Sequence, residues 1–301
     1  MFSALMKELI YPIYICLSIL TILSCQKDGN YDAPNPLDTV HSAGLSRLSN
    51  VRIAILGDSI STFDGFSPSN VFGYDGIRYK AYYPKGDVQI VNNMWWYKVA
   101  LSLGIDPASI SNCSWSGSYI TGDSSSTTNA YAGCSYRRVS DLAYKGIPDI
   151  VICFISCNDW ANGVSIGNWM ATDMIPKSGI VSTMREAYAL MISRIRESYP
   201  ESIIICMTIL DDTKRDKTIG WPSNNSKGVT IEEWNNNIKE VSLAFGCYTI
   251  ELQDAGINYY NITSLTVDNG LHPNAAGMTL IAEKVTKEIN TILSSYSSDS
   301  N

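Results

Sequence analysis

The sequence predicts a three-layer α/β/α sandwich around a central, mainly parallel sheet of about five strands, as in flavodoxin-like folds. Short, unbroken apolar runs recur along the chain, and segments with the period of an amphipathic helix lie between them. Unbroken apolar runs are expected for strands that helices cover on both faces. Because such strands alternate here with helices, the sheet is expected to be parallel.

The expected elements follow in chain order. Strands are expected at 51–56, 109–112, 150–155, 203–209 and 247–252. Helices are expected at 94–103, 180–199, from 230 onward and at 275–293. Gly104 suits the C-terminal cap of the first helix, and Thr230 with Glu233 forms a capping-box pattern. Ligands bind beyond the carboxyl ends of parallel strands, so functional side chains are expected directly after the apolar runs.

The N-terminal segment has the features of an export signal. Lys7 precedes an apolar stretch at 9–23, which is shorter than the roughly 20 residues that span a membrane. Residues 22–25, Ile-Leu-Ser-Cys, resemble the lipobox of bacterial lipoproteins, which implies cleavage before Cys25 and lipidation of that cysteine. An ordinary signal peptide with a chance cysteine is the alternative.

We therefore expect three segments. Residues 1–24 are expected to form a lipoprotein signal peptide, 25–50 a flexible tether and 51–296 the folded domain. The protein is expected to be exported and to contact the membrane only through its lipid anchor. The anchor would lie on the periplasmic or cell-surface side of the outer membrane.

Composition narrows the function classes. A chain of 301 residues with 45% hydrophobic residues can bury one large core, and a net charge of −7 argues against nucleic acid as a partner. Among eight cysteines, only Cys113 and Cys134 lie in polar, loop-like sequence and form a plausible disulfide pair, which the sequence leaves undecided. With only two histidines and no closely spaced cysteine pair, no metal site is expected.

Four polar or glycine positions stand where chemistry is expected. Ser59, Gly117 and Asn158 each follow a predicted strand, and His272 directly precedes the last helix. Taken singly, each also has a structural interpretation: a helix cap, a loop glycine, a turn asparagine and a structural histidine. His272 is the only conventional imidazole base inside the domain.

Together, Gly-Asp-Ser at 57–59, Asn…Ser-Gly at 112–117, Asn-Asp at 158–159 and His-Pro at 272–273 resemble the SGNH (GDSL-type) hydrolase family, over residues 51 to about 290. The resemblance implies Ser59 as nucleophile and His272 as general base. It also implies an oxyanion hole formed by the backbone N–H groups of Ser59 and Gly117 and the side-chain amide of Asn158. The implied reaction is ester hydrolysis through an acyl-enzyme, without metal or organic cofactor.

The sequence departs from the family pattern at two positions. Ser156 stands where the third motif usually begins with glycine, and Asn269 stands where the acid usually lies, three residues before the histidine. Asp268 is one residue further from His272. Three groups could therefore support the imidazole of His272: Asp268 through a different turn, the side chain of Asn269, or a backbone carbonyl. Of these we favour Asp268.

The substrate is predicted from aromatic residues. Trp115 and Trp160 flank the expected oxyanion residues and are either a stacking platform for sugar rings or core residues. Further aromatic side chains follow Ser59: Phe63, Phe66, Phe72, Tyr74, Tyr79, Tyr82 and Tyr83. We expect acetyl esters of a polysaccharide or small molecule as substrate. The alternatives are a catalytically weak glycan-binding surface lipoprotein and an O-acyltransferase on the same fold.

Overall fold

The computed structural model describes residues 48–66, 81–126, 132–174, 179–210, 224–258, 260–268 and 270–298. All of them fall within one of two compact units of the chain, Val40–Asn301. The expected signal peptide, Cys25 and Asn269 lie outside the described residues.

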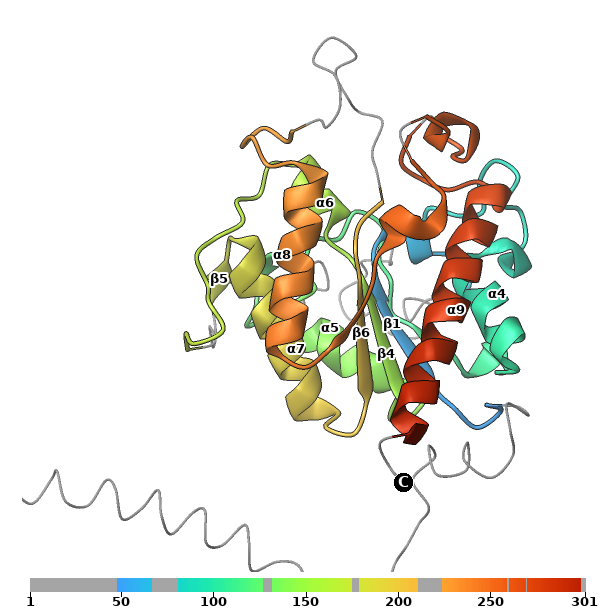
Figure 1. Cartoon of the computed structure of the whole chain (residues 1–301), viewed down its shortest axis with the longest axis horizontal. Coiled ribbons are helices and arrows are strands. Elements are labelled where there is room, and N and C mark those ends of the chain that lie inside the picture. Colours follow the sequence, from blue (N-terminus) through green and yellow to red (C-terminus); the bar gives the residue numbers. More distant parts are fainter. Residues whose placement is uncertain are drawn as a thin grey trace, which may run out of the picture. The chain divides into compact units, whose positions relative to one another are not determined.

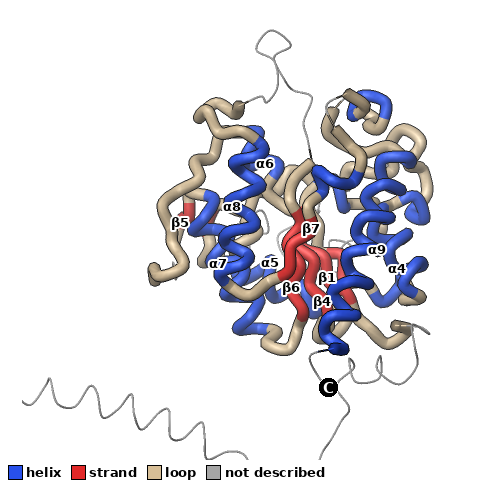
Figure 2. The backbone as a smooth tube through the Cα atoms, in the orientation of Figure 1, coloured by secondary structure: helices blue, strands red, loops and turns tan. Residues whose placement is uncertain are grey.

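Five parallel strands form the central sheet (Figure 2). They are β1 (Ile53–Gly57), β2 (Ser111–Asn112), β4 (Ile150–Phe154), β6 (Ile203–Met207) and β7 (Tyr248–Ile250). Their order is β2-β1-β4-β6-β7, and all neighbours pair in parallel. Every residue of β1, β4 and β6 is buried, which explains why these strands read as unbroken apolar runs. The predicted α/β fold is confirmed.

Helices cover both faces of this sheet (Figure 1). On one side α4 (Trp95–Leu103) packs against α9 (Ala275–Ser298). On the other side α7 (Met184–Ser198) contacts both α5 (Tyr136–Ser140) and α8 (Ile231–Ala244). The remaining elements are α6 (Cys157–Ala161), short 3₁₀ helices that include Ser59–Ser61, and an antiparallel pair of β3 (Gly122–Asp123) and β5 (Ile180–Val181).

The helix ends largely follow the sequence signals. Gly104 caps α4 in the left-handed conformation at φ 72°, and Thr230 Oγ1 accepts a hydrogen bond from Glu233 N at 2.9 Å at the start of α8. One start was predicted wrongly: α7 begins at Met184 instead of residue 180, because residues 180–181 pair with β3. That pairing is non-local, so helical periodicity does not reveal it.

The connections reverse direction at β1. From β1 the chain passes through α4 to β2 on one side, whereas from β4 it passes through α7 to β6 on the other. Because α4 and α7 cover opposite faces (Figure 1), a crevice is expected at the carboxyl ends of β1 and β4. Ser59 follows the first of these strands and Asn158 the second.

Cys113 and Cys134, the plausible pair in the sequence, do not form a disulfide. Both residues are buried free thiols, and Cys113 Sγ donates a hydrogen bond to Asp141 O at 3.0 Å. Cys113 N also donates to Ile55 O at 2.8 Å, so this residue extends the contact between β2 and β1. The polar residues around both cysteines gave the appearance of a surface loop, although tertiary packing buries them.

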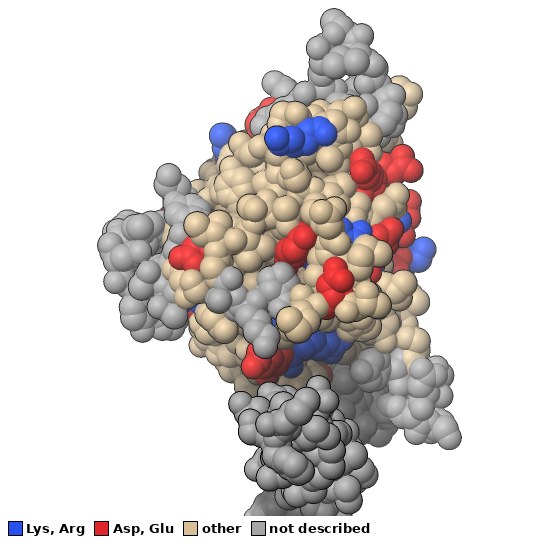
Figure 3. Space-filling model, turned by 90° about the vertical axis from the view of Figure 1, so that its left-hand side faces the viewer, with Lys and Arg blue, Asp and Glu red and all other residues tan. Residues whose placement is uncertain are grey.

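The surface carries both signs of charge. Figure 3 shows scattered Lys, Arg, Asp and Glu side chains among a large uncharged area on the face that it draws. Within the described ranges, no helix combines the length and the apolar character that crossing a membrane requires.

Candidate active site

Ser59 lies in a tight turn directly after β1. A Cβ atom at Gly57 would lie 2.5 Å from Ser114 Oγ and 3.1 Å from Ser61 Cβ, so a side chain at the end of the strand would crowd both serines. Asp58 then starts a 3₁₀ helix at Ser59–Ser61 by accepting a hydrogen bond from Ile60 N at 3.2 Å. This local structure holds the Ser59 hydroxyl at the carboxyl end of the sheet.

Asp58 itself is buried next to Ser59 in the sequence. Cys157 Sγ donates to its Oδ2 at 3.0 Å, and Arg138 lies close enough to stabilise its charge. Burial nevertheless dominates and raises the pKa of the Asp58 carboxyl above its ordinary value. Arg138 Nη2 also donates to Gly57 O at 2.8 Å, which fixes the end of β1.

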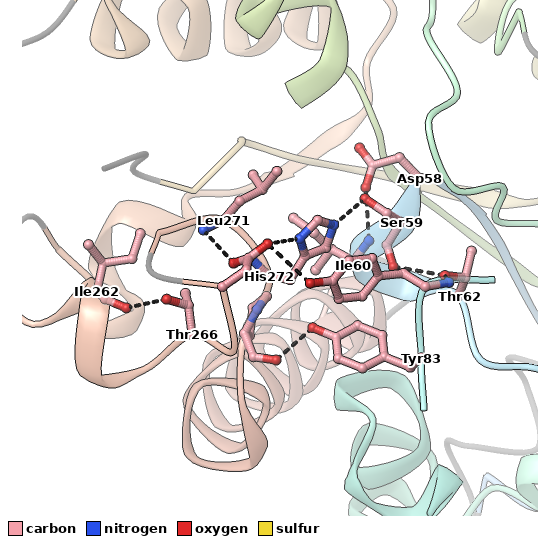
Figure 4. Close-up of polar contacts among 12 residues, drawn as sticks. Asp58, Ser59, Ile60, Thr62, Tyr83, Ile262, Thr266, Leu271 and His272 are labelled. Carbon is pink, nitrogen blue, oxygen red and sulfur yellow. Dashed lines mark hydrogen bonds and ion pairs between the residues drawn. The ribbon is translucent and has the colours of Figure 1, made fainter. Parts of the chain in front are cut away.

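A hydrogen-bonded row joins Ser59, His272 and Asp268 (Figure 4). His272 Nε2 lies 2.8 Å from Ser59 Oγ, and His272 Nδ1 is hydrogen-bonded to Asp268 Oδ2. The serine and the histidine are 213 positions apart in the sequence. Both side chains are almost fully buried, with relative exposures of 4% and 7%.

The turn from Asp268 to His272 explains the unusual spacing of the acid. Asp268 Oδ1 accepts hydrogen bonds from Leu271 N at 3.1 Å and from His272 N at 2.9 Å, while Gly270 has a φ of 151°. Val267 N donates to His272 O at 2.9 Å and closes the turn. A carboxylate four residues before the histidine thereby reaches its ring, as we favoured from the sequence.

The charge of Asp268 is set by two opposing effects. Burial raises its pKa, but hydrogen bonds from the side chain and backbone of His272 outweigh burial and hold the pKa below its ordinary value. The carboxylate is therefore ionised at neutral pH. An ionised Asp268 accepts from Nδ1–H, which leaves Nε2 free to accept the proton of Ser59.

The segments that carry the three expected oxyanion donors are joined by hydrogen bonds, since Ser118 Oγ donates to Gly57 O at 3.3 Å and Ser118 O accepts from the side-chain amide of Asn158. Gly117 has a φ of 79°, is exposed, and has no atom within 4 Å of the position that a Cβ would take. Asn158 Nδ2 donates one hydrogen bond to Ser118 O at 2.9 Å, which orients the amide and leaves its second N–H for a ligand. Among the described residues, no recorded hydrogen bond uses the backbone N–H of Ser59 or Gly117.

Of the two interpretations of Trp115 and Trp160, a stacking platform or core residues, the structure supports the core. Their relative exposures are 3% and 5%, so neither ring can present a face to a sugar. Trp160 Nε1 donates to Val229 O at 3.0 Å, and Trp115 N donates to Gly57 O at 3.1 Å. Both residues belong to the core beneath the site.

Two polar residues of the site were not assigned a role from the sequence. Asp159 accepts from Ile120 N at 2.8 Å and from the backbone and hydroxyl of Thr121 at 3.0 and 2.7 Å. Burial still raises its pKa to about 6. Asn112 Nδ2 donates to Ser61 O at 2.8 Å. Asn112 is the last residue of β2 and Asp159 follows β4. Their places at the carboxyl ends of strands were the signal that could have identified them.

Tyr82 is a third residue that the sequence did not assign to the site. Its ring stacks on the imidazole of His272, with centroids 3.4 Å apart and planes at 9°, and its hydroxyl donates to Asp268 Oδ2 at 3.1 Å. The sequence marked Tyr82 only as one of several aromatic residues suited to sugars. Of that group, Phe72, Tyr74 and Tyr79 lie outside the described residues.

A parallel α/β sandwich whose strand ends bring serine, histidine and aspartate into one hydrogen-bonded row is the architecture of an SGNH-type hydrolase. The chain belongs to the GDSL-like lipase/acylhydrolase family, whose model matches residues 51–289, and it is an ester hydrolase of that family.

Solved structures agree with this fold. A GDSL-like lipase of Bacteroides uniformis is 24% identical, with a TM-score of 0.54, and the match covers 80% of this chain and 96% of that chain. A GDSL-like lipase of Bacteroides ovatus is 22% identical, with a TM-score of 0.54 and coverages of 80% and 98%. A protein from Lactobacillus plantarum is 19% identical, with a TM-score of 0.54 and coverages of 81% and 98%. Among curated proteins, no significant match was found.

Proposed function

We propose that the protein is a serine esterase in which Ser59 attacks the carbonyl carbon of a carboxylic ester and His272 is the general base. The hydrogen bond of 2.8 Å between Ser59 Oγ and His272 Nε2 carries this proposal. In this geometry the imidazole takes the hydroxyl proton while the new C–O bond forms. Asp268 keeps the ring in the required tautomer and stabilises the imidazolium.

The remaining steps follow from the same groups. The negative charge of the tetrahedral intermediate faces the N–H groups of Ser59, Gly117 and Asn158. As the intermediate collapses, the proton on His272 passes to the departing alcohol, and the acyl group stays on Ser59. Water then attacks the acyl-enzyme with His272 again as base, which releases the carboxylic acid and restores the serine hydroxyl.

The substrate we propose is a short acyl ester, acetyl in the first place, carried by a carbohydrate. Tyr119, two residues after Gly117, supports this choice because its ring is only partly buried. Burial, together with the charge of Asp159, raises the pKa of Tyr119, so its hydroxyl stays neutral and can hydrogen-bond to a sugar.

Turnover of 4-nitrophenyl acetate by the wild type and by Ser59→Ala tests the reaction. We expect kcat of the variant to fall by at least about 10³-fold, since the nucleophile and base act as a unit. Undiminished turnover in Ser59→Ala would show that another group performs the chemistry. No turnover by well-folded wild type would favour a glycan-binding protein instead.

A second experiment tests the substrate. We expect faster release of acetate from acetylated oligosaccharides than of fatty acid from phospholipid vesicles, and the reverse order would overturn the carbohydrate proposal. Added sugar alcohols distinguish the two fates of the acyl-enzyme. Hydrolysis yields free acetate, whereas predominant formation of new sugar esters would identify an acyltransferase.

We also propose export and lipidation at Cys25, on the strength of residues 22–25 alone. Membrane fractionation of cells that express the full chain or its Cys25→Ser variant tests this. We expect the variant to leave the membrane fraction, and equal membrane association of both proteins would contradict the anchor.

A further inference from the structure

Tyr82 is tied to the nucleophile turn through Thr62. Thr62 Oγ1 accepts a hydrogen bond from Tyr82 N at 2.8 Å and donates one to Ser59 O at 2.9 Å. The hydroxyl of Thr62 thus bridges the two backbones as both acceptor and donor, and Thr62 is buried. This chain of bonds fixes the backbone of Tyr82 relative to Ser59 (Figure 4 labels Ser59 and Thr62).

The side chain of Tyr82 is tied to the other half of the site. Its ring lies almost parallel to the His272 imidazole, 3.4 Å away between centroids. Its hydroxyl donates to Asp268 Oδ2, the same oxygen that is hydrogen-bonded to His272 Nδ1. One residue thus contacts both members of the acid–base pair and is bonded through Thr62 to the nucleophile segment.

These contacts suit the chemistry of a general base. Burial and the nearby charge of Asp268 raise the pKa of Tyr82, so its hydroxyl remains a donor. The aromatic face attracts the positive charge that the imidazole gains from Ser59. Other charges near the imidazole are the buried Asp58 and the ammonium of Lys85, which lies 4.5 Å from the Tyr82 centroid.

We infer that Tyr82 is a positioning residue, which holds the His272 ring against rotation and the Asp268 carboxylate in register with it. The inference rests on the proposed function, in which His272 is the base. Because a misplacement of about 1 Å in a catalytic group can lower the rate about 10²-fold, such a clamp has a measurable effect on turnover.

Tyr83 provides a matched control. It is the next residue, and its hydroxyl donates to Pro273 O at 2.6 Å, so it also joins this loop to the His272 turn. Its ring, however, meets the imidazole edge-on at 77° and 6.4 Å, and its hydroxyl bonds a backbone carbonyl instead of Asp268. Tyr83→Phe therefore removes an equivalent tether without touching the acid–base pair.

Kinetics with 4-nitrophenyl acetate separate these roles. We expect Tyr82→Phe to lower kcat by about 3- to 10-fold and Tyr82→Leu by about 10²-fold, both with KM little changed, because the first removes only the hydroxyl and the second also removes the stacked ring. Tyr83→Phe is expected to keep wild-type kcat. Thermal unfolding of Tyr82→Phe should match the wild type within a few degrees.

The pH profile and an NMR signal add two readouts that a purely structural role would not move. Without the Tyr82 hydroxyl, the Asp268 carboxylate has one hydrogen-bond donor fewer, so its charge acts more strongly on the ring of His272. The acid limb of kcat/KM in Tyr82→Phe should therefore move toward higher pH. The proton resonance of His272 Nδ1–H, recorded without substrate, should shift in Tyr82→Phe and not in Tyr83→Phe.

Failure of this inference is distinguishable from failure of the proposed function. If Ser59→Ala loses turnover while Tyr82→Phe keeps wild-type kcat, acid limb and Nδ1–H resonance, Tyr82 does not position the pair. Equal changes in these three quantities for Tyr82→Phe and Tyr83→Phe would mean that both tyrosines only attach their loop to the His272 turn. That result would also overturn the inference. Undiminished turnover in Ser59→Ala would overturn both the esterase mechanism and the inference.

Discussion

Ser156 adopts a left-handed backbone with a φ of 104°, and its Oγ accepts a hydrogen bond from Trp234 Nε1 at 3.1 Å. Ser156 is the only described residue other than glycine with positive φ. It keeps the backbone conformation that suits glycine, and its hydroxyl links the start of α6 to α8. Asn158, two residues later, thus retains its place despite the departure from the family motif.

This relationship predicts an order of stability among variants. Ser156→Gly and Ser156→Ala both lose the bond to Trp234, but alanine keeps a Cβ at positive φ. We expect the free energy of unfolding in urea to be about 1 kcal/mol higher for the glycine variant than for the alanine variant. Equal stabilities would mean that this backbone position carries no conformational cost.

The second prediction concerns the acid of the site. Asp268→Ala removes the partner of His272 Nδ1 and should lower kcat by about 10³- to 10⁴-fold with the substrate 4-nitrophenyl acetate. Asn269→Ala, at the neighbouring position, should lower kcat much less. Small and equal effects of the two substitutions would show that neither side chain supports the histidine.

A third prediction concerns Asn158 as an oxyanion donor. Asn158→Ala should lower kcat by about 10²- to 10³-fold and change KM little, because the donor acts mainly on the charge of the transition state. Asn162→Ala is the matched control. Asn162 Nδ2 donates to Asn158 O at 2.8 Å, one helical turn away, and its loss should leave kcat near the wild-type value. A drop of similar size in both variants would assign the effect to the α6 backbone.

The fourth prediction is a pH dependence of stability. Burial raises the pKa of Asp159 to about 6, above the value of about 3.9 for an unfolded aspartate. Between these values the folded state holds a proton that the unfolded state has lost, so stability falls as pH rises from about 4 to 6. Urea unfolding across this window should show a smaller fall for Asp159→Asn than for the wild type.

Asp268→Asn provides the opposite control for that experiment. Because hydrogen bonds lower the folded pKa of Asp268, its contribution to stability is fully present above about pH 3.9 and is lost only as pH falls below it. The difference in stability between the wild type and Asp268→Asn should therefore narrow as pH falls below about 3.9. A difference that stays unchanged there would contradict the assigned direction of the shift.

The fold could be predicted because its signals are local. Strands β1, β4 and β6 are buried along their whole length. A strand that is buried on both faces has a continuous apolar sequence, and this can be recognised without knowing its neighbours in the sheet. The positions of Ser59, Gly117 and Asn158 were found by the same logic, since they follow strands that share one edge of the sheet.

Features that depend on distant partners could not be predicted. The hydroxyl of Tyr82 donates a hydrogen bond to Asp268, 186 positions away in the sequence. The sequence around neither residue contains a pattern that predicts this bond. The burial of Trp115 and of Cys113 likewise depends on how the elements pack, whereas their neighbours in sequence are polar. The turn that brings Asp268 to His272 was left open because family spacing alone pointed to position 269.

The long separation between Ser59 and His272 also bears on when the protein becomes active. His272, the proposed base, lies just before α9, and α9 packs against α4, near the beginning of the domain. A nascent or still unfolded chain therefore possesses a serine but no imidazole beside it. Ester hydrolysis therefore requires completed folding. The chain is expected to gain this activity only after its last helix has packed against the rest of the domain.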